Sequence, residues 1–114
     1  MSMIDKATTH FETVLAQGLL GPIKVPEWEN AEIYYKPSTT MYEQSKIIEL
    51  TQGGKATEAL IQTLIMRARD KDGKTVFGSQ DKHKLMRSVD PKIILTIVTA
   101  MNADDENIEA ELGN

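Results

Sequence analysis

The chain has 114 residues, of which 40% are hydrophobic and 26% are charged, so it has the size and composition of one small globular domain. If compact, a chain of this length has a radius of gyration of about 13 Å. The absence of cysteine excludes disulfides, thiol catalysis and cysteine-ligated metal centres. No apolar run approaches the roughly twenty residues of a membrane span, and the first residues lack the pattern of a signal peptide, so we expect a cytoplasmic protein.

The net charge of −4 is unevenly distributed. All five acidic residues after position 101 lie in the segment NADDENIEAELGN, which has no base, whereas the preceding residues hold 12 acids and 13 bases. An acidic tail repels phosphate and a neutral body does not attract it, so we expect no sequence-independent binding of nucleic acid. We predict a single helical domain over residues 1–102 and an acidic tail over residues 103–114.

The first predicted helix covers residues 4–15 and ends near Gly18. Its apolar residues recur at spacings of three and four, which places them on one stripe: Ile4, Ala7, Phe11, Val14 and Leu15.

The period then changes to two, with Ile23 and Val25 in one segment and Ile33 and Tyr35 in the next, which predicts a β-hairpin joined at residues 29–30. Pro26 lacks an amide donor, so we expect the first segment to be an edge strand. Because a two-stranded hairpin is marginal in water, its apolar face must rest on the helices.

Two helices are predicted next. The first begins after a cap at Ser38, Thr39 or Thr40 and runs to about Thr51. Gly53 and Gly54 separate it from a helix over residues 55–70, whose broad apolar face indicates the central helix of the core: Ala56, Leu60, Ile61, Leu64, Ile65 and Ala68.

Asp72-Gly73 predicts a turn, followed by a short extended segment over residues 75–77. Ser79 or Asp81 is expected to cap a helix ending at Ser88. Asp90 and Pro91 form the start of a last helix, with a buried stripe of Ile93, Ile94, Ile97, Val98 and Met101. The fold class is therefore mainly α (α+β), with about five helices and a short β-hairpin in the N-terminal half.

No pattern for catalysis or cofactor binding is present. If Gly73 occupied the sixth position of a calcium loop, its first and twelfth positions would be Ala68 and Ser79, where acids are required. His10 and His83 lack a neighbouring nucleophile and acid, and they lack metal-site spacing, so we interpret both as surface or boundary residues. We expect no enzyme activity, no metal and no cofactor.

The one basic cluster consists of Arg67, Arg69, Lys71 and Lys74. A nucleic-acid site is one interpretation, but we favour cations stabilising the negative end of a helix. A small DNA-binding regulator would have to read bases with Lys82, Lys84 and Arg87 on one short helix.

Three segments together resemble the tail assembly chaperones of long-tailed bacteriophages: VPEWENAEIYYKPSTT (residues 25–40), RARDKDGKTVFGSQD (residues 67–81) and DPKIILTIVTAMN (residues 90–102). The resemblance covers most of residues 25–102. It implies a protein of the host bacterial cytoplasm, absent from the mature virion, that binds the helical tape-measure protein, keeps it soluble and helps recruit tail-tube subunits. It also implies a longer, frameshifted form that contacts the tail-tube protein, with the acidic tail as the junction.

No membrane partner follows from this resemblance, and self-association remains open. The alternatives are a structural tail protein of the virion or, less favoured, the DNA-binding regulator. Met side chains adapt well to a helical partner, so the Met-bearing surfaces and the stripe of the first helix could contact one, but we interpret most of these residues as part of the chain's own core. Trp28, Tyr34 and Tyr35 fit a core and a partner site equally well. The candidate partner-binding residues are Phe11, Leu15, Trp28, Tyr34, Tyr35, Met41, Met66 and Met86.

Overall fold

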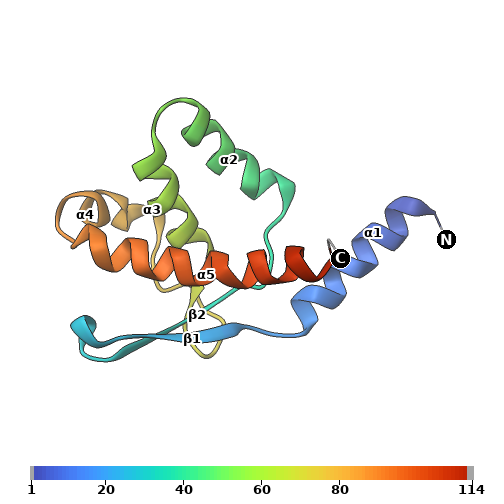
Figure 1. The fold of residues 1–114 in the computed structure, drawn as a ribbon, viewed down its shortest axis with the longest axis horizontal. Coiled ribbons are helices and arrows are strands. Elements are labelled where there is room, and N and C mark those ends of the chain that lie inside the picture. The colour runs from blue at the N-terminus through green and yellow to red at the C-terminus, as the bar shows by residue number, and fades with distance from the viewer. Residues whose placement is uncertain (1, 113–114) are drawn as a thin grey trace.

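The computed structural model describes the backbone of residues 2–112 and the side chains of residues 2–103. Within that range it has five α-helices and one three-stranded sheet, which confirms a mainly helical α+β fold (Figure 1). The elements are, in chain order, α1 (Met3–Ala16), β1 (Leu20–Val25), η1 (Pro26–Trp28), β2 (Ala31–Tyr35), α2 (Met41–Gln52), α3 (Ala56–Arg67), β3 (Ala68–Arg69), η2 (Ser79–Asp81), α4 (Lys82–Arg87) and α5 (Pro91–Leu112).

The sheet is antiparallel with the order β1-β2-β3, so β1 is an edge strand, as Pro26 predicts. Ile23 pairs with Ile33, and the chain reverses between the strands through Glu29 and Asn30, both in the left-handed conformation. The predicted hairpin is therefore present. The sequence does not predict the third strand, because Ala68 continues the apolar spacing of α3 and two residues are too few to show an alternation of their own.

The core lies where α3, α4, α5 and the sheet meet. Leu64 at the centre of α3 is fully buried and packs in one cluster with the α5 stripe and the inward residues of both long strands. These strand and α5 residues are Val25, Ile33, Tyr35, Ile94, Ile97, Val98 and Met101. The predictions of a central helix and a buried α5 stripe are confirmed, except that Ala56 of the predicted α3 face is exposed and that Leu60 and Ile93 are half-buried.

Helix starts follow the predicted caps in two cases. At α2, the Glu43 amide donates to Thr40 Oγ1 (3.1 Å) and the Thr40 amide donates to Glu43 Oε1 (3.0 Å), which is a capping box. At α5, the Lys92 amide donates to Asp90 Oδ1 (3.0 Å). The start of α4 differs: a 3₁₀ turn precedes it, and neither Ser79 nor Asp81 caps it with a side chain.

The end of α3 also differs from expectation, because the helix stops at Arg67 instead of continuing to Asp70. Arg69 Nη1 donates to the carbonyls of Met66 and Ala68 (both 2.9 Å), which confirms the helix-end interpretation for this residue. The Asp72-Gly73 turn is confirmed, with Gly73 at φ +86° and Asp70 Oδ1 accepting from the Asp72 amide (2.8 Å).

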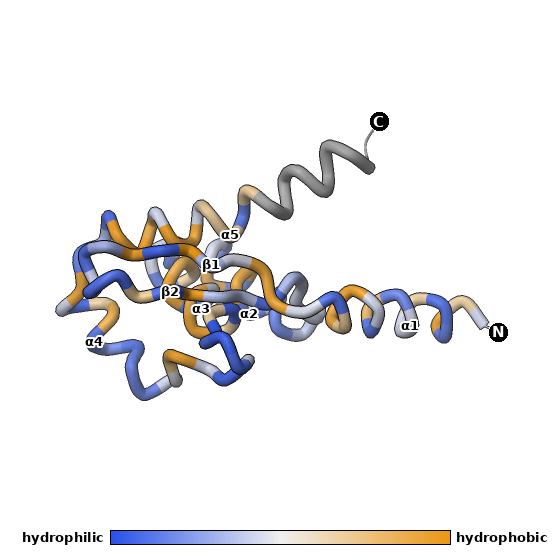
Figure 2. Tube along the Cα trace, turned by 90° about the horizontal axis from the view of Figure 1, so that it is seen from below, coloured by the Kyte–Doolittle hydropathy of each residue, from blue (hydrophilic) through white to orange (hydrophobic). Residues whose placement is uncertain are grey.

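The molecule is elongated because α1 projects from the body. The radius of gyration is 15.1 Å and the principal extents are 49 × 33 × 30 Å, against the radius of about 13 Å expected for a compact chain of this length. In both Figure 1 and Figure 2, α1 leaves the body at the end opposite α4 and its N-terminus lies far from the core. At the other end of the chain, α5 runs past Asn102, and the separation of a body from an acidic tail stays a prediction.

Candidate partner-binding surface

Helix α1 forms an arm whose side chains are not used by the core. No residue of α1, all of which the structure describes, is buried. The helix is held by local interactions: Asp5 and Ser2 form a capping box, and Thr8 and Thr13 donate their hydroxyls to carbonyls of the preceding turn. Its ends are thus satisfied, while the body covers its apolar stripe only in part.

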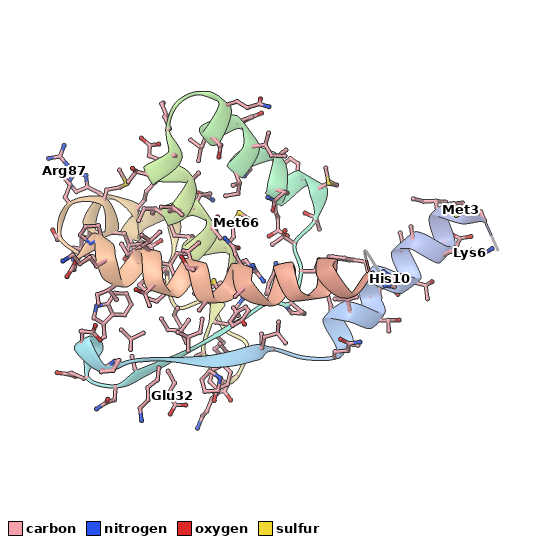
Figure 3. All side chains as sticks on the ribbon, in the orientation of Figure 1. Met3, Lys6, His10, Glu32, Met66 and Arg87 are labelled. Atoms are coloured by element: carbon pink, nitrogen blue, oxygen red, sulfur yellow. The ribbon has the colours of Figure 1, made fainter. Side chains whose placement is uncertain are left out.

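The stripe on the arm is exposed along its outer half. Met3 is 77% exposed and Ile4 is 68% exposed, and Leu15 is exposed nearer the body. Phe11 and Val14 are half-buried. Figure 3 shows Met3, Lys6 and His10 spaced along the arm, with Met3 and Lys6 toward its N-terminal end.

A groove lies between the arm and the first turn of α2. It has a volume of about 420 Å³ and a mostly apolar lining, to which Ala7, Phe11 and Met41 contribute. Met41 is 77% exposed, and Tyr42 beside it is 73% exposed with its ring under the Lys46 ammonium at 5.1 Å. The arm stripe and this groove form one apolar surface, which we call the arm surface. It comprises Met3, Ile4, Ala7, Phe11, Leu15, Met41 and Tyr42.

The start of α2 is fixed electrostatically. Partial burial raises the pKa of the Glu43 carboxyl, but hydrogen bonds from the Thr40 backbone and from Lys36 Nζ (3.2 Å) outweigh this effect, so the pKa lies below its ordinary value. The carboxylate therefore stays charged at neutral pH and holds both the helix start and the end of β2. These contacts keep Met41 in place on the groove beside the arm.

Arg67 turns inward instead of lying on a basic surface. It is 5% exposed, its Nε and Nη2 atoms donate to the Lys36 carbonyl (3.3 and 2.9 Å), and its guanidinium lies over the Tyr35 ring at 5.3 Å. A polar pocket of about 190 Å³ lies beside it, lined by residues of α2 and α3 and by Asn102. Arg67 joins the sheet to α3, which is a structural role.

A second, smaller apolar groove lies between α3, α4 and α5. It has a volume of about 110 Å³, and its lining includes Leu60, Met86 and Val89. Met86 is partly exposed at its rim. The groove is large enough for one apolar side chain of a partner.

The structure separates the candidate partner residues into groups. Phe11, Leu15 and Met41 come together on the arm surface, whereas Met86 is at the α3–α4–α5 groove. Met66 is half-buried and lines the polar pocket beside Arg67.

The three aromatic candidates lie in β2 and in the η1 turn that precedes it. Tyr35 is 3% exposed and sits in the core, so we leave it out of the surface. Trp28 packs against the core and meets the Phe77 ring edge-on at 6.3 Å. Tyr34 is half-buried, and its hydroxyl donates to Glu32 Oε2 (3.4 Å).

Sequence reasoning did not select several exposed apolar residues as partner-binding candidates. These are Met3, Tyr42, Ile48 and Leu95. Ile4 belongs to the stripe of the first helix, for which contact with a partner is the predicted alternative to a core role. A signal for Met3 was present, because that stripe continues to the N-terminus of α1, and Gly18 and Gly21 separate the helix from the rest of the chain. Both glycines have positive φ.

His10 and His83 are both exposed, as predicted, and lie on separate helices. Among the described residues no group of three or more His, Asp or Glu side chains could hold a metal ion. No helix in the described part of the chain is long and apolar enough to cross a membrane.

The comparisons with known proteins identify a similar fold. No protein-family model and no curated protein matches the sequence. Among solved structures, the chain is similar to the structure of the bacteriophage HK97 tail assembly chaperone, with a TM-score of 0.60 and 15% sequence identity over 86% of this chain and 93% of that chain. At this identity the match establishes a shared fold, and it extends over nearly the full length of both proteins.

Proposed function

We propose that this protein is a phage tail assembly chaperone that binds the tape-measure protein, keeps it soluble and helps recruit tail-tube subunits. The observation that carries the proposal is the fold shared with the HK97 tail assembly chaperone over nearly the whole of both chains. It acts without a reaction, in the host bacterial cytoplasm, and is absent from the mature virion.

The apolar surfaces supply a physical means of binding such a client. A tape-measure protein presents long amphipathic helices, and a helix binds by placing its apolar stripe in a groove. The arm surface offers Phe11 and Met41 on the two walls of such a groove, and Met side chains adapt to different partners. Binding the exposed state of the client lowers its free concentration by mass action, without a cofactor.

Recruitment of the tail tube is assigned to a longer, frameshifted form, in which the acidic tail is the junction. Mass spectrometry of the protein expressed from its native gene tests this part, because a second product carrying the peptides of residues 1–102 with a different C-terminus is expected. A single product would remove the longer form from the proposal and leave client binding intact.

Co-expression with fragments of the tape-measure protein tests the central claim. We expect fragments that precipitate alone to stay in solution and to be captured with the tagged chaperone. Met41→Ser combined with Tyr42→Ser should lower the captured fraction at least several-fold. Leu95→Ser is the matched control, because Leu95 is an exposed apolar residue on α5, outside the arm surface. Wild-type protein that captures no fragment would refute the proposal.

A structural tail protein of the virion is the competing assignment, and particle composition separates the two. Mass spectrometry of purified mature particles should detect no peptide of this chain. Its presence in stoichiometric amounts would replace the chaperone role with a structural one. A DNA-binding role has less support, because the ammonium of Lys82, one of its three candidate base-reading residues, lies 3.4 Å from the Glu58 carboxylate.

A further inference from the structure

We propose that the α3–α4–α5 groove binds an acidic segment of a partner protein, which places one Leu, Ile or Met side chain in the groove and carboxylates on both sides of it. The groove lies at the α4 end of the molecule, opposite the arm in both Figure 1 and Figure 2. Binding at this site does not depend on the proposed function, because the groove shares no residue with the arm surface.

The groove is an apolar recess that the core itself shapes. Its volume of about 110 Å³ leaves room for one large aliphatic side chain, and three helices contribute to its lining. Leu85 and Ile94 line it from the core side and are each 4% exposed, whereas Met86 at the rim is 39% exposed. Because Leu85 and Ile94 belong to the core cluster, the recess is present before a partner binds. An aliphatic side chain that enters it is removed from water.

Positive charge surrounds the groove. Residues 82–92, which include α4 and the start of α5, contain four Lys or Arg residues and a single acid. Arg87 follows Met86 and Lys92 follows Pro91, so both cations are adjacent to residues that line the groove. Both are exposed, and neither forms an ion pair with any residue that the structure describes. Figure 3 shows the Arg87 side chain extending outward from the α4 end of the molecule.

The acids nearest to these cations are engaged in contacts within the molecule. The Glu58 carboxylate lies 3.4 Å from the Lys82 ammonium, which ties α3 to α4. Asp90 Oδ1 accepts from the Lys92 amide (3.0 Å) and so caps α5. These contacts leave the guanidinium of Arg87 and the ammonium of Lys92 available to the carboxylates of a partner.

The start of α5 carries a cation where an acid is favoured. An acid in the first turn stabilises the positive end of a helix, and α1 and α2 both follow this preference. Helix α5 has no acid in its first turn, which contains Lys92. Thr57 and Pro91 line the groove, so the first turns of α3 and α5 both border it. Helix dipoles and side-chain charges therefore have the same sign beside the groove, and partner carboxylates relieve their repulsion.

The combination of recess and charge favours an acidic peptide over nucleic acid. A phosphate backbone contacts cations but places no aliphatic side chain in an apolar groove, and a purely apolar segment leaves the cations without partners. An apolar anchor between acids matches both parts of the surface. One anchor and a few exposed ion pairs give a weak complex, so we expect a dissociation constant on the order of 100 μM.

Nuclear magnetic resonance of the ¹⁵N-labelled full chain tests the site, with a synthetic peptide as the probe. The peptide has about twelve residues, with one Leu at its centre, Asp and Glu on both sides, and Gly and Ser elsewhere. We expect saturable shifts at the amides of residues 84–90, with a midpoint on the order of 100 μM, and none along the arm. No shift at these residues up to about 2 mM peptide would overturn the proposal, and so would shifts confined to residues 3–15.

Altered peptides separate the anchor from the charge. Replacing the central Leu by Ser should weaken binding at least tenfold, because it removes the side chain that occupies the groove. Replacing the acids by Lys should abolish the shifts, and raising NaCl from about 20 mM to about 300 mM should weaken the parent peptide at least threefold. Equal binding of the Ser peptide would reduce the site to a charge contact and overturn the proposal. Duplex DNA that binds the same residues more tightly than the parent peptide would overturn it in favour of nucleic acid.

Matched variants of the chain test the two parts of the surface. Arg87→Gln with Lys92→Gln should weaken binding of the parent peptide at least fivefold. Lys6→Gln with Lys24→Gln is the control with the same change in net charge, because both lysines are exposed and outside the groove. Met86→Ser should weaken binding at least threefold, because it removes a contact at the rim. Circular dichroism checks that each variant is folded, and equal binding by the two double variants would overturn the proposal.

Discussion

Leu64→Ala and Leu95→Ala form a matched pair that tests how burial divides this molecule. The residue and the change are the same, but Leu64 at the centre of α3 is fully buried, whereas Leu95 on α5 is 53% exposed. Truncating a buried Leu costs about 2.7–5 kcal/mol, because the transfer free energy of the lost methyl groups adds to that of the cavity left behind. Truncating Leu95 should cost at most about 0.5 kcal/mol, since surface changes rarely exceed this value and Ala is the better helix former.

The loss expected for Leu64→Ala is a large fraction of the total stability of about 5–15 kcal/mol expected for a domain. At a shift of roughly 4–8 °C per kcal/mol, Leu64→Ala should lower the Tm by on the order of 15 °C or more, and Leu95→Ala by no more than about 4 °C. Urea unfolding followed by circular dichroism, with the slope checked for constancy, gives both free energies. Losses within about 1 kcal/mol of each other would refute the assignment of Leu64 to the centre of the core.

Three further predictions concern the chain's turns and caps. Thr40→Ala removes one half of the capping box at α2 and should lower the free energy of unfolding by about 1 kcal/mol, measured by urea titration. Gly21→Ala should lower the free energy of unfolding by about 1–3 kcal/mol, because φ is +101° and a new Cβ would lie 3.0 Å from the Ile33 carbonyl oxygen. Gly73→Ala should lower it by less, because φ is also positive there but a new Cβ would meet no atom within 4 Å. The pKa of Glu43 is lowered in the folded state, so the charged carboxylate contributes to the free energy of unfolding above the ordinary carboxyl pKa, and this contribution is lost as the pH falls through the folded value. Between pH 7 and pH 3, wild-type protein should therefore lose more stability than Glu43→Gln.

The helices were predictable because their ends and faces have local causes. Thr40 and Asp90 cap helices that begin one residue later, and both caps are recognisable from side-chain oxygens followed by an apolar period. The apolar spacing of α5 fixed its buried stripe in the same way. Such signals come from residues close together in the sequence, so they do not depend on how distant segments of the chain pack.

The remaining features depend on contacts between distant segments. The sequence predicts Arg67 as one of the cations at the end of a helix, but its side chain turns inward to the Lys36 carbonyl and the Tyr35 ring, which lie across the fold at the end of β2. The next two residues leave the helix and pair with β2 at Tyr34 and Tyr35. The spacing of apolar residues predicts that one face of a helix is covered, but it does not predict which segment covers it. For this reason the sequence predicts the stripe of α1 to be part of the core, although no residue of α1 is buried.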